Sequence, residues 1–205
     1  MLTYNEREIA NIVVEALVEY GLNEHLSQDN VWDWFRENDM SYLGFWASNG
    51  ATKTCIGHED LEGWVIKVGH TSGVGLNYAR LEYDNYREAV ACGLAYYFPE
   101  TYYLGEFGGQ SYFLQQEVEC DEDQVTSDWY ERLRDSYDED GEEYDADQIW
   151  DEVYNLDDDD KALLLFHNGA LCDFLWNHRI NDLHEGNFGY VRGCMVICDF
   201  SGFRG

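Results

Sequence analysis

Residues 182–187 read DLHEGN, and residues 196–202 read VICDFSG. Asp182 lies five residues before Asn187, and Asp199 follows that asparagine by twelve residues, at the end of an apolar run. Each of these residues, taken singly, is more often a turn former or a chance match than part of a site. The interpretation therefore depends on their order and their spacing.

Alternating residues between these motifs predict two short strands, over 188–191 and 195–198, joined by a tight turn. Such a hairpin would place Asn187 and Asp199 side by side. Amide and carboxylate oxygens suit Mg²⁺, and phosphoryl transfer needs a further carboxylate to orient the attacking hydroxyl. We therefore expect metal ligands at Asn187 and Asp199 and a catalytic acid at Asp182.

A lysine occupies an apolar, strand-like run further upstream, GWVIKVG over residues 63–69. Burying Lys67 in a strand costs free energy unless the ammonium meets an anion. Glu88 lies on a helix predicted over 81–97 and is expected to pair with Lys67, which leaves the ammonium directed at phosphate groups. Taken alone, Lys67 would equally well reach solvent.

Hydrophobic periodicity predicts the remaining elements. Helices are expected over 5–20, 30–37 and 158–177. Five short antiparallel strands are expected over 43–47, 52–56, 63–68, 101–107 and 111–119. The fold class is therefore α+β, in three segments. These are an N-terminal helical extension (1–40), a lobe with the sheet and one helix (41–119), and a C-terminal lobe (120–205).

Taken together, these motifs resemble those of the protein-kinase-like superfamily over about residues 43–200. VIKVG is similar to the strand that carries the ATP lysine, and NYREAVACGLAYY to the helix that carries its glutamate partner. FLQQEVE resembles the hinge that adenine contacts, while NDLHEGN and CDFSG resemble the catalytic loop and the metal motif. The resemblance implies a two-lobed kinase-like fold with a truncated C-terminal lobe and ATP and Mg²⁺ as cofactors. Adenine contacts are then expected at Glu117, Val118 and Glu119.

Several positions depart from the family pattern. The only candidate for the glycine-rich phosphate loop consists of Ser48, Asn49, Gly50, Ala51 and Thr52. Ile180 and Asn181 stand where protein kinases usually carry His and Arg, and Ser201 stands where the metal motif usually has glycine. We expect no activation segment after Asp199. ATP binding is accordingly a firmer expectation than transfer to a protein.

A narrower resemblance concerns the early serine/threonine protein kinase of short-tailed coliphages, on VIKVG, the helical extension and the DxHxGN loop. It implies transfer of the ATP γ-phosphate to Ser or Thr of host proteins, in a host shut-off or anti-defence role. DLHEGN also resembles the catalytic loop of aminoglycoside and choline kinases. A small-molecule phosphotransferase therefore stays open as an alternative.

The charge of the chain is extreme, with 42 acidic and 12 basic residues and a formal net charge of −30. Half of the acids lie between residues 117 and 160. Such a surface repels nucleic acid and anionic membranes and attracts basic protein surfaces. A solvated helix face is one interpretation of this segment. The other is a catalytically weak, kinase-like inhibitor whose acidic surface mimics nucleic acid and blocks a host nucleic-acid-binding or defence protein.

Targeting signals are not expected. No apolar run reaches the roughly 18 residues of a membrane helix, and the N-terminus lacks the basic and apolar regions of a signal peptide. The six cysteines form no CxxC pair, which argues against zinc and fits a reducing cytoplasm. We expect a protein of the cytoplasm, in the host cell if it is viral, without a direct nucleic-acid or membrane partner.

Overall fold

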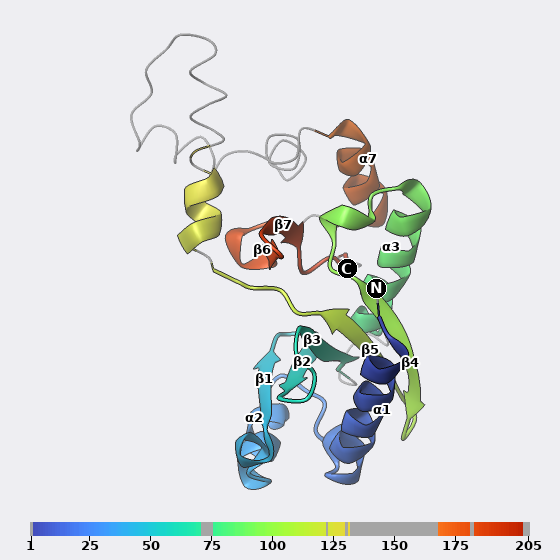
Figure 1. Cartoon of the computed structure of the whole chain (residues 1–205), viewed down its shortest axis with the longest axis vertical. Coiled ribbons are helices and arrows are strands. Elements are labelled where there is room, and N and C mark those ends of the chain that lie inside the picture. Colours follow the sequence, from blue (N-terminus) through green and yellow to red (C-terminus); the bar gives the residue numbers. More distant parts are fainter. Residues whose placement is uncertain are drawn as a thin grey trace. The chain divides into compact units, whose positions relative to one another are not determined.

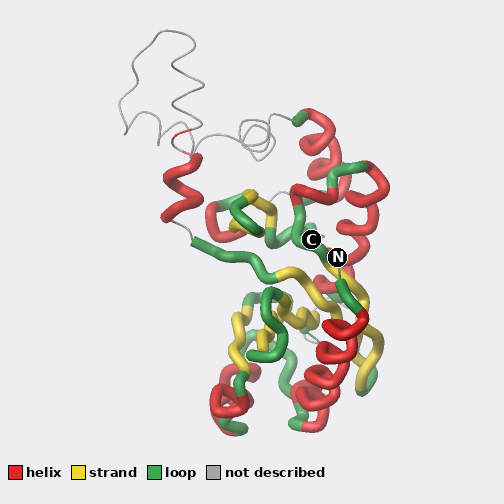
Figure 2. Tube along the Cα trace, in the orientation of Figure 1, coloured by secondary structure: helices red, strands yellow, loops and turns green. Residues whose placement is uncertain are grey.

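The computed structural model describes residues 2–70, 76–121, 123–129, 131, 168–180 and 183–202. The chain divides into two compact units. Unit 1 comprises Met1–Ala95 and Pro99–Glu117, and unit 2 comprises Tyr96–Phe98 and Val118–Gly205. The described residues form a mixed α+β protein, as the sequence predicts (Figures 1 and 2).

Unit 1 is built on a five-stranded antiparallel sheet with the strand order β1-β2-β3-β5-β4, which confirms the predicted strands. The strands are β1 (Phe45–Asn49), β2 (Lys53–His58), β3 (Trp64–Gly69), β4 (Thr101–Phe107) and β5 (Gln110–Gln116). The turn between β4 and β5 uses Gly108 and Gly109 with φ angles of 56° and 81°. Both angles lie in the left-handed region that the tight hairpin turn requires, which is why the two glycines predict it.

One face of the sheet carries the hydrophobic core of unit 1. The helices α1 (Tyr4–Glu19) and α2 (Asn30–Glu37) contribute to the same buried cluster as Ile66 of β3 and Leu114 of β5. The expected helical extension therefore shares the core of the sheet (Figure 1).

The start of α1 is fixed to strands that lie far along the chain. Thr3 and Glu6 form a capping box, and Glu6 Oε1 also accepts a hydrogen bond from Trp64 Nε1 at 3.2 Å. Arg7 Nη2 donates to the carbonyl oxygen of Tyr103, 96 residues later, at 2.9 Å. The first turn of the chain is thus held by β3 and by β4.

The opposite face of the sheet packs against α3 (Tyr78–Cys92), which contacts β3, β4 and β5. Successive residues of a strand point to opposite faces, so Lys67 faces away from the core residue Ile66. The ring of Tyr83 on α3 lies 5.5 Å from that of Phe113, the cross-strand partner of Lys67. The predicted helix over 81–97 was too long at its end, because Gly93 (φ 75°) caps α3.

Unit 2 contains an antiparallel hairpin of β6 (Phe188–Val191) and β7 (Cys194–Ile197). Residues 123–129 are helical, and the ring of Trp129 packs edge-on against that of Phe188 at 5.2 Å. Short 3-10 turns complete the described elements: η1 (Leu22–Glu24), η2 (Met40–Leu43), η3 (Ala95–Tyr97) and η4 (Glu185–Asn187).

The helix predicted over 158–177 does not run through Asn168. This residue is extended (φ −134°, ψ 98°) and caps a new helix, α7 (Gly169–His178), by accepting from the backbone N–H groups of Ala170 and Leu171. Asparagine at an N-cap competes with helix continuation in this way. Residues 158–167 lie outside the described ranges.

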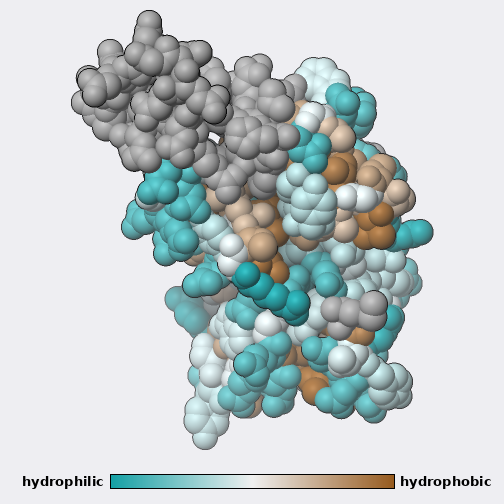
Figure 3. Space-filling view, turned by 45° about the horizontal axis from the view of Figure 1, so that its top comes forward, coloured by the Kyte–Doolittle hydropathy of each residue, from teal (hydrophilic) through white to brown (hydrophobic). Residues whose placement is uncertain are grey.

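The visible surface is mostly polar. Figure 3 shows one face of the molecule, on which hydrophilic residues prevail and hydrophobic residues reach the surface in small patches. Within the described part of the chain, no helix has the length and apolar character needed to cross a membrane.

Candidate functional site

A buried ionic cluster lies on the α3 face of the sheet. Lys67 Nζ on β3 donates to Glu82 Oε2 on α3 at 2.8 Å, and Lys53 Nζ on β2 lies 3.0 Å from Glu82 Oε1. Lys53, Lys67 and Glu82 are 6%, 5% and 0% exposed. Separating the partners of a buried ion pair strongly lowers the stability of the folded protein. We therefore expect the three side chains to keep fixed positions.

The expected pairing of Lys67 with Glu88 was wrong in its choice of glutamate, because the carboxylate within hydrogen-bond distance is that of Glu82. Six residues separate the two glutamates, which turns Glu88 about 240° around the helix from Glu82. Glu88 is exposed, whereas Glu82 shares the buried stripe of α3 with Ala79 and Ala89. That stripe of small residues was the signal in the sequence for the inward-facing glutamate.

Lys53 is a residue of this cluster that the sequence interpretation missed. It opens β2 opposite Gly69, and Cys55, two residues on, lies opposite Lys67. Cross-strand partners point to the same face of a sheet, so both lysines point towards α3. The position of Lys53 follows only from the register between β2 and β3, because the sequence KTCIGH does not indicate which face of the strand α3 covers.

The candidate phosphate loop, Ser48 to Thr52, forms a tight turn between β1 and β2. The N–H of Gly50 donates to the carbonyl of Lys53 at 3.0 Å, and the amide of Asn49 donates to the carbonyl of Gln28 at 2.7 Å. Thr54 Oγ1 donates to Asn49 Oδ1 at 2.6 Å. The Asn49 side chain therefore braces the turn within unit 1. The expected phosphate contacts would come from the backbone of this turn, and they stay a prediction.

His70 completes this brace from the end of β3. Its Nε2 lies 2.9 Å from Thr54 Oγ1 and 3.0 Å from Asn49 Oδ1, and its Nδ1 lies 3.2 Å from the carbonyl of Ala51. Burial lowers the pKa of His70 and the charge of Lys53 lowers it further, while the hydrogen bond to Ala51 opposes them. The buried imidazole thus favours its neutral form.

The expected adenine hinge divides between the two units. The N–H of Glu117 donates to the carbonyl of Gly63 at 2.9 Å in unit 1. In unit 2, Glu119 exchanges two backbone hydrogen bonds with Tyr190, at 3.0 and 2.9 Å. A backbone N–H donates one good hydrogen bond, so those of Glu117 and Glu119 are engaged. The expected adenine contacts at Glu117, Val118 and Glu119 stay a prediction.

The expected metal ligands lie at one end of the β6–β7 hairpin. The N–H of Cys198 donates to the carbonyl of Asn187 at 2.9 Å, which extends the ladder by one pair and places Asn187 opposite Cys198, the residue before Asp199. Ser201 Oγ donates to Asp199 Oδ1 at 3.1 Å. The serine that replaces the usual glycine therefore hydrogen-bonds the carboxylate expected to hold the metal.

The donor set of this hairpin fits Mg²⁺. Magnesium takes oxygen ligands, usually one or two from the protein together with water and phosphate oxygens. Asn187 and Asp199 offer one amide and one carboxylate group of this kind. In the described ranges, no three His, Cys, Asp or Glu side chains form a cluster that would hold a metal by themselves.

Two parts of the expected site fall outside the described residues. These are Asp182, the expected catalytic acid, and most of the acidic segment between residues 117 and 160. Their roles stay predictions from the sequence. Neither a family model, nor a curated protein, nor a solved structure matches the chain.

Proposed function

We propose that the protein is a phage-type protein kinase that transfers the γ-phosphate of ATP to Ser or Thr of host proteins. The observation that carries this proposal is the bond between Lys67 and Glu82. A lysine on the third strand of an antiparallel sheet, paired with a glutamate on the following helix, is the arrangement by which protein kinases position the lysine for ATP phosphates.

Each residue has a chemical task in this proposal. Lys67 donates to phosphate oxygens, and Glu82 holds the ammonium in place. Asn187 and Asp199 hold Mg²⁺, which neutralises charge that develops on the phosphates. Asp182 accepts the proton as the acceptor hydroxyl attacks the γ-phosphorus; the bond to the bridging oxygen then breaks and ADP leaves.

Lys53 adds a second cation beside the first. Ammonium groups at a buried position strengthen the binding of an anion, because a low dielectric weakens charge interactions less than water does. The braced turn from Ser48 to Thr52 replaces a flexible glycine-rich loop. We propose that Lys53 supplies part of the phosphate contact that this turn lacks.

A second candidate is a kinase-like inhibitor of a host nucleic-acid-binding or defence protein. The observation that favours it is the net charge of −30, with half of the acids in one segment. An acidic surface of this kind attracts proteins that normally bind a polyanion. This candidate requires no phosphoryl transfer.

The decisive experiment incubates the pure protein with γ-labelled ATP and Mg²⁺, with and without host lysate. A kinase labels Ser or Thr of host proteins, and Asp182→Asn abolishes the label while ATP binding persists. Label in the small-molecule fraction would point to a small-molecule phosphotransferase. ATP binding without transfer to any acceptor would favour the inhibitor.

A further inference from the structure

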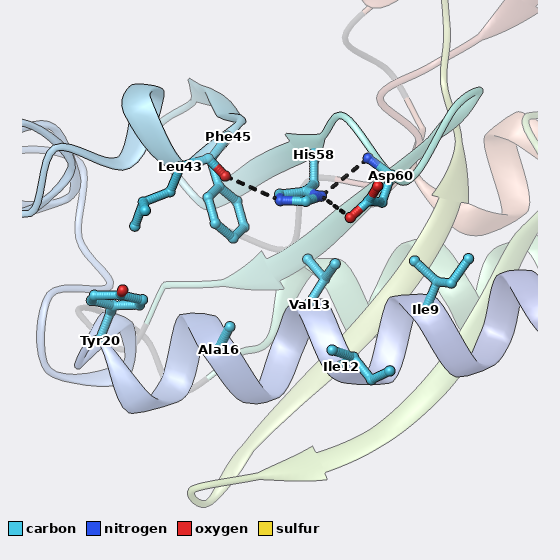
Figure 4. A pocket seen from close by; sticks show the side chains of 9 residues that line it. All are labelled: Ile9, Ile12, Val13, Ala16, Tyr20, Leu43, Phe45, His58 and Asp60. Atoms are coloured by element: carbon cyan, nitrogen blue, oxygen red, sulfur yellow. Dashed lines mark hydrogen bonds and ion pairs between the residues drawn. The ribbon is translucent and has the colours of Figure 1, made fainter.

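An apolar groove runs along the core-side surface of unit 1, between α1 and the start of the sheet (Figure 4). Its volume is about 310 Å³. One wall is a stripe of α1, and the other comes from η2, β1 and the end of β2. The lining residues are Ile9, Ile12, Val13, Ala16, Tyr20, Leu43, Phe45, His58 and Asp60.

The rim of the groove exposes large apolar side chains. Ile12 is 60% exposed, and Tyr20 and Leu43 also rank among the exposed large hydrophobic residues. Single exposed apolar residues are normal, but apolar side chains gathered along a groove mark a place where a partner binds. Tyrosine is also a residue type that dominates binding energy at interfaces.

The polar end of the groove is fixed by His58 and Asp60. The N–H of Asp60 donates to His58 Nδ1 at 3.1 Å, and His58 Nε2 lies 3.2 Å from the carbonyl oxygen of Leu43. The carboxylate of Asp60 is 70% exposed. A partner in the groove would therefore meet a carboxylate at this end.

Acidic side chains line the outer edge of α1 beside the groove. Glu8, Glu15 and Glu19 are exposed. At about 100° per residue they fall on the same side of the helix as Ile12, next to the stripe that lines the groove. Neither lysine nor arginine occurs among the lining residues. The groove thus combines an apolar floor with an acidic border.

We propose that this groove binds a segment of a partner protein that carries large apolar side chains flanked by lysine or arginine. Charge favours this occupant over a second copy of the chain and over the chain's own acidic segment. A second copy would bring a further net charge of −30 against the acidic border, and the chain's own segment between residues 117 and 160 holds half of its acids. Both would be repelled, whereas a basic segment is attracted.

The length of the groove suits a short peptide. Eleven residues of α1 separate Ile9 from Tyr20, which corresponds to about 16 Å along the helix. About three turns of a partner helix would span that distance. The proposal does not rest on phosphoryl transfer, because the groove lies on the core side of the sheet and Lys67 faces the other side.

The test uses the full chain and a fluorescein-labelled peptide of about 14 residues, with leucines on one helical face and lysines on the other. A matched peptide has every leucine replaced by alanine at the same charge. Fluorescence anisotropy should show about tenfold tighter binding of the leucine peptide. Ile12→Ser and Leu43→Ser should each weaken that binding about fivefold or more, whereas Val90→Ser, an exposed site on α3, should leave it unchanged.

Charge variants separate the groove from the acidic surface as a whole. Glu15→Gln with Glu19→Gln should weaken binding, while Glu106→Gln with Asp123→Asn, which removes the same charge elsewhere, should not. Equal effects of the two pairs, or equal binding of the two peptides, would overturn the proposal. Sedimentation that shows a dimer broken by Ile12→Ser would also overturn it, since a second copy would then occupy the groove.

Discussion

Lys53 and Lys67 share one buried carboxylate, because each ammonium lies within 3.0 Å of a different oxygen of Glu82. The two lysines lie on adjacent strands, and the carboxylate comes from the helix that covers them. One side chain of α3 therefore positions both cations of unit 1 that we assign to phosphate.

Replacing Glu82 with Gln should destabilise the protein strongly. The change leaves two buried ammonium groups without this carboxylate, and breaking a buried ion pair typically costs about 3–5 kcal/mol. Urea denaturation should show the loss as a lower midpoint. Glu106→Gln, the same substitution at an exposed glutamate of β4, is the control and should leave the midpoint nearly unchanged. A similar loss in both variants would contradict the central role of Glu82.

Removing either lysine should weaken ATP binding. A hydrogen bond between an ammonium and a phosphate is charge-assisted, and its loss should lower affinity by roughly ten- to a hundredfold. Calorimetry with ATP and Mg²⁺ on Lys67→Met and Lys53→Met measures each contribution. Arg36→Met, which removes an exposed cation on α2, serves as the control. If only Lys67→Met loses affinity, Lys53 is structural.

Asp199→Ala should abolish the part of ATP binding that depends on Mg²⁺. The substitution removes an anionic oxygen ligand from a hard cation. Manganese can replace Mg²⁺ in paramagnetic resonance titrations, which report metal binding directly. Ser201→Ala frees Asp199 Oδ1 from its hydrogen bond and should retain metal binding. Equal ATP affinity in wild type and Asp199→Ala would refute the metal assignment.

Acidification should destabilise the protein through His70. The folded state lowers the pKa of His70, so the unfolded chain takes up this proton first, near its ordinary pKa of about 6.5. The free energy of unfolding then falls as the pH drops below that value. The melting temperature of wild type should therefore fall more between pH 7.5 and pH 5.5 than that of His70→Gln. The same substitution at the exposed His184 should leave the wild-type trend intact.

The acidic segment should bind a basic protein surface. Neutral amides at Asp138, Glu139, Asp140, Glu142 and Glu143 should slow association more than they speed release, because exposed charges act mainly by steering. Pull-downs from host lysate at low and moderate salt compare this variant with wild type. Identical partners for both proteins at both salt concentrations, or none for either, would leave the segment as a solvated face.

The strands of unit 1 could be predicted because their signals are local. Alternation of side chains and the pair Gly108-Gly109 depend only on neighbouring residues, and they give the five strands of the sheet. The paired ends of the β6–β7 hairpin follow in the same way, which is why Asn187 and Asp199 were assigned to one place.

The details of the site could not be predicted because they depend on tertiary geometry. The choice between Glu82 and Glu88 rests on the starting residue and the rotation of α3, which are the least certain features of a helix read from sequence. The place of Lys53 beside Glu82 depends on the register between β2 and β3, which the sequence does not give. The apolar periodicity runs through Asn168 without a break, so the sequence does not show that its side chain caps α7.

The hydrogen bond between Arg7 of α1 and Tyr103 of β4 has a consequence for synthesis on the ribosome. The N-terminal helix emerges first, but its partner Tyr103 is made 96 residues later. At roughly 5–20 residues per second, α1 waits about 5–20 s before this contact can form. During that interval its apolar face lacks the strand that completes the core. We therefore expect the apolar face of α1 to be open to chaperones until β4 has left the exit tunnel.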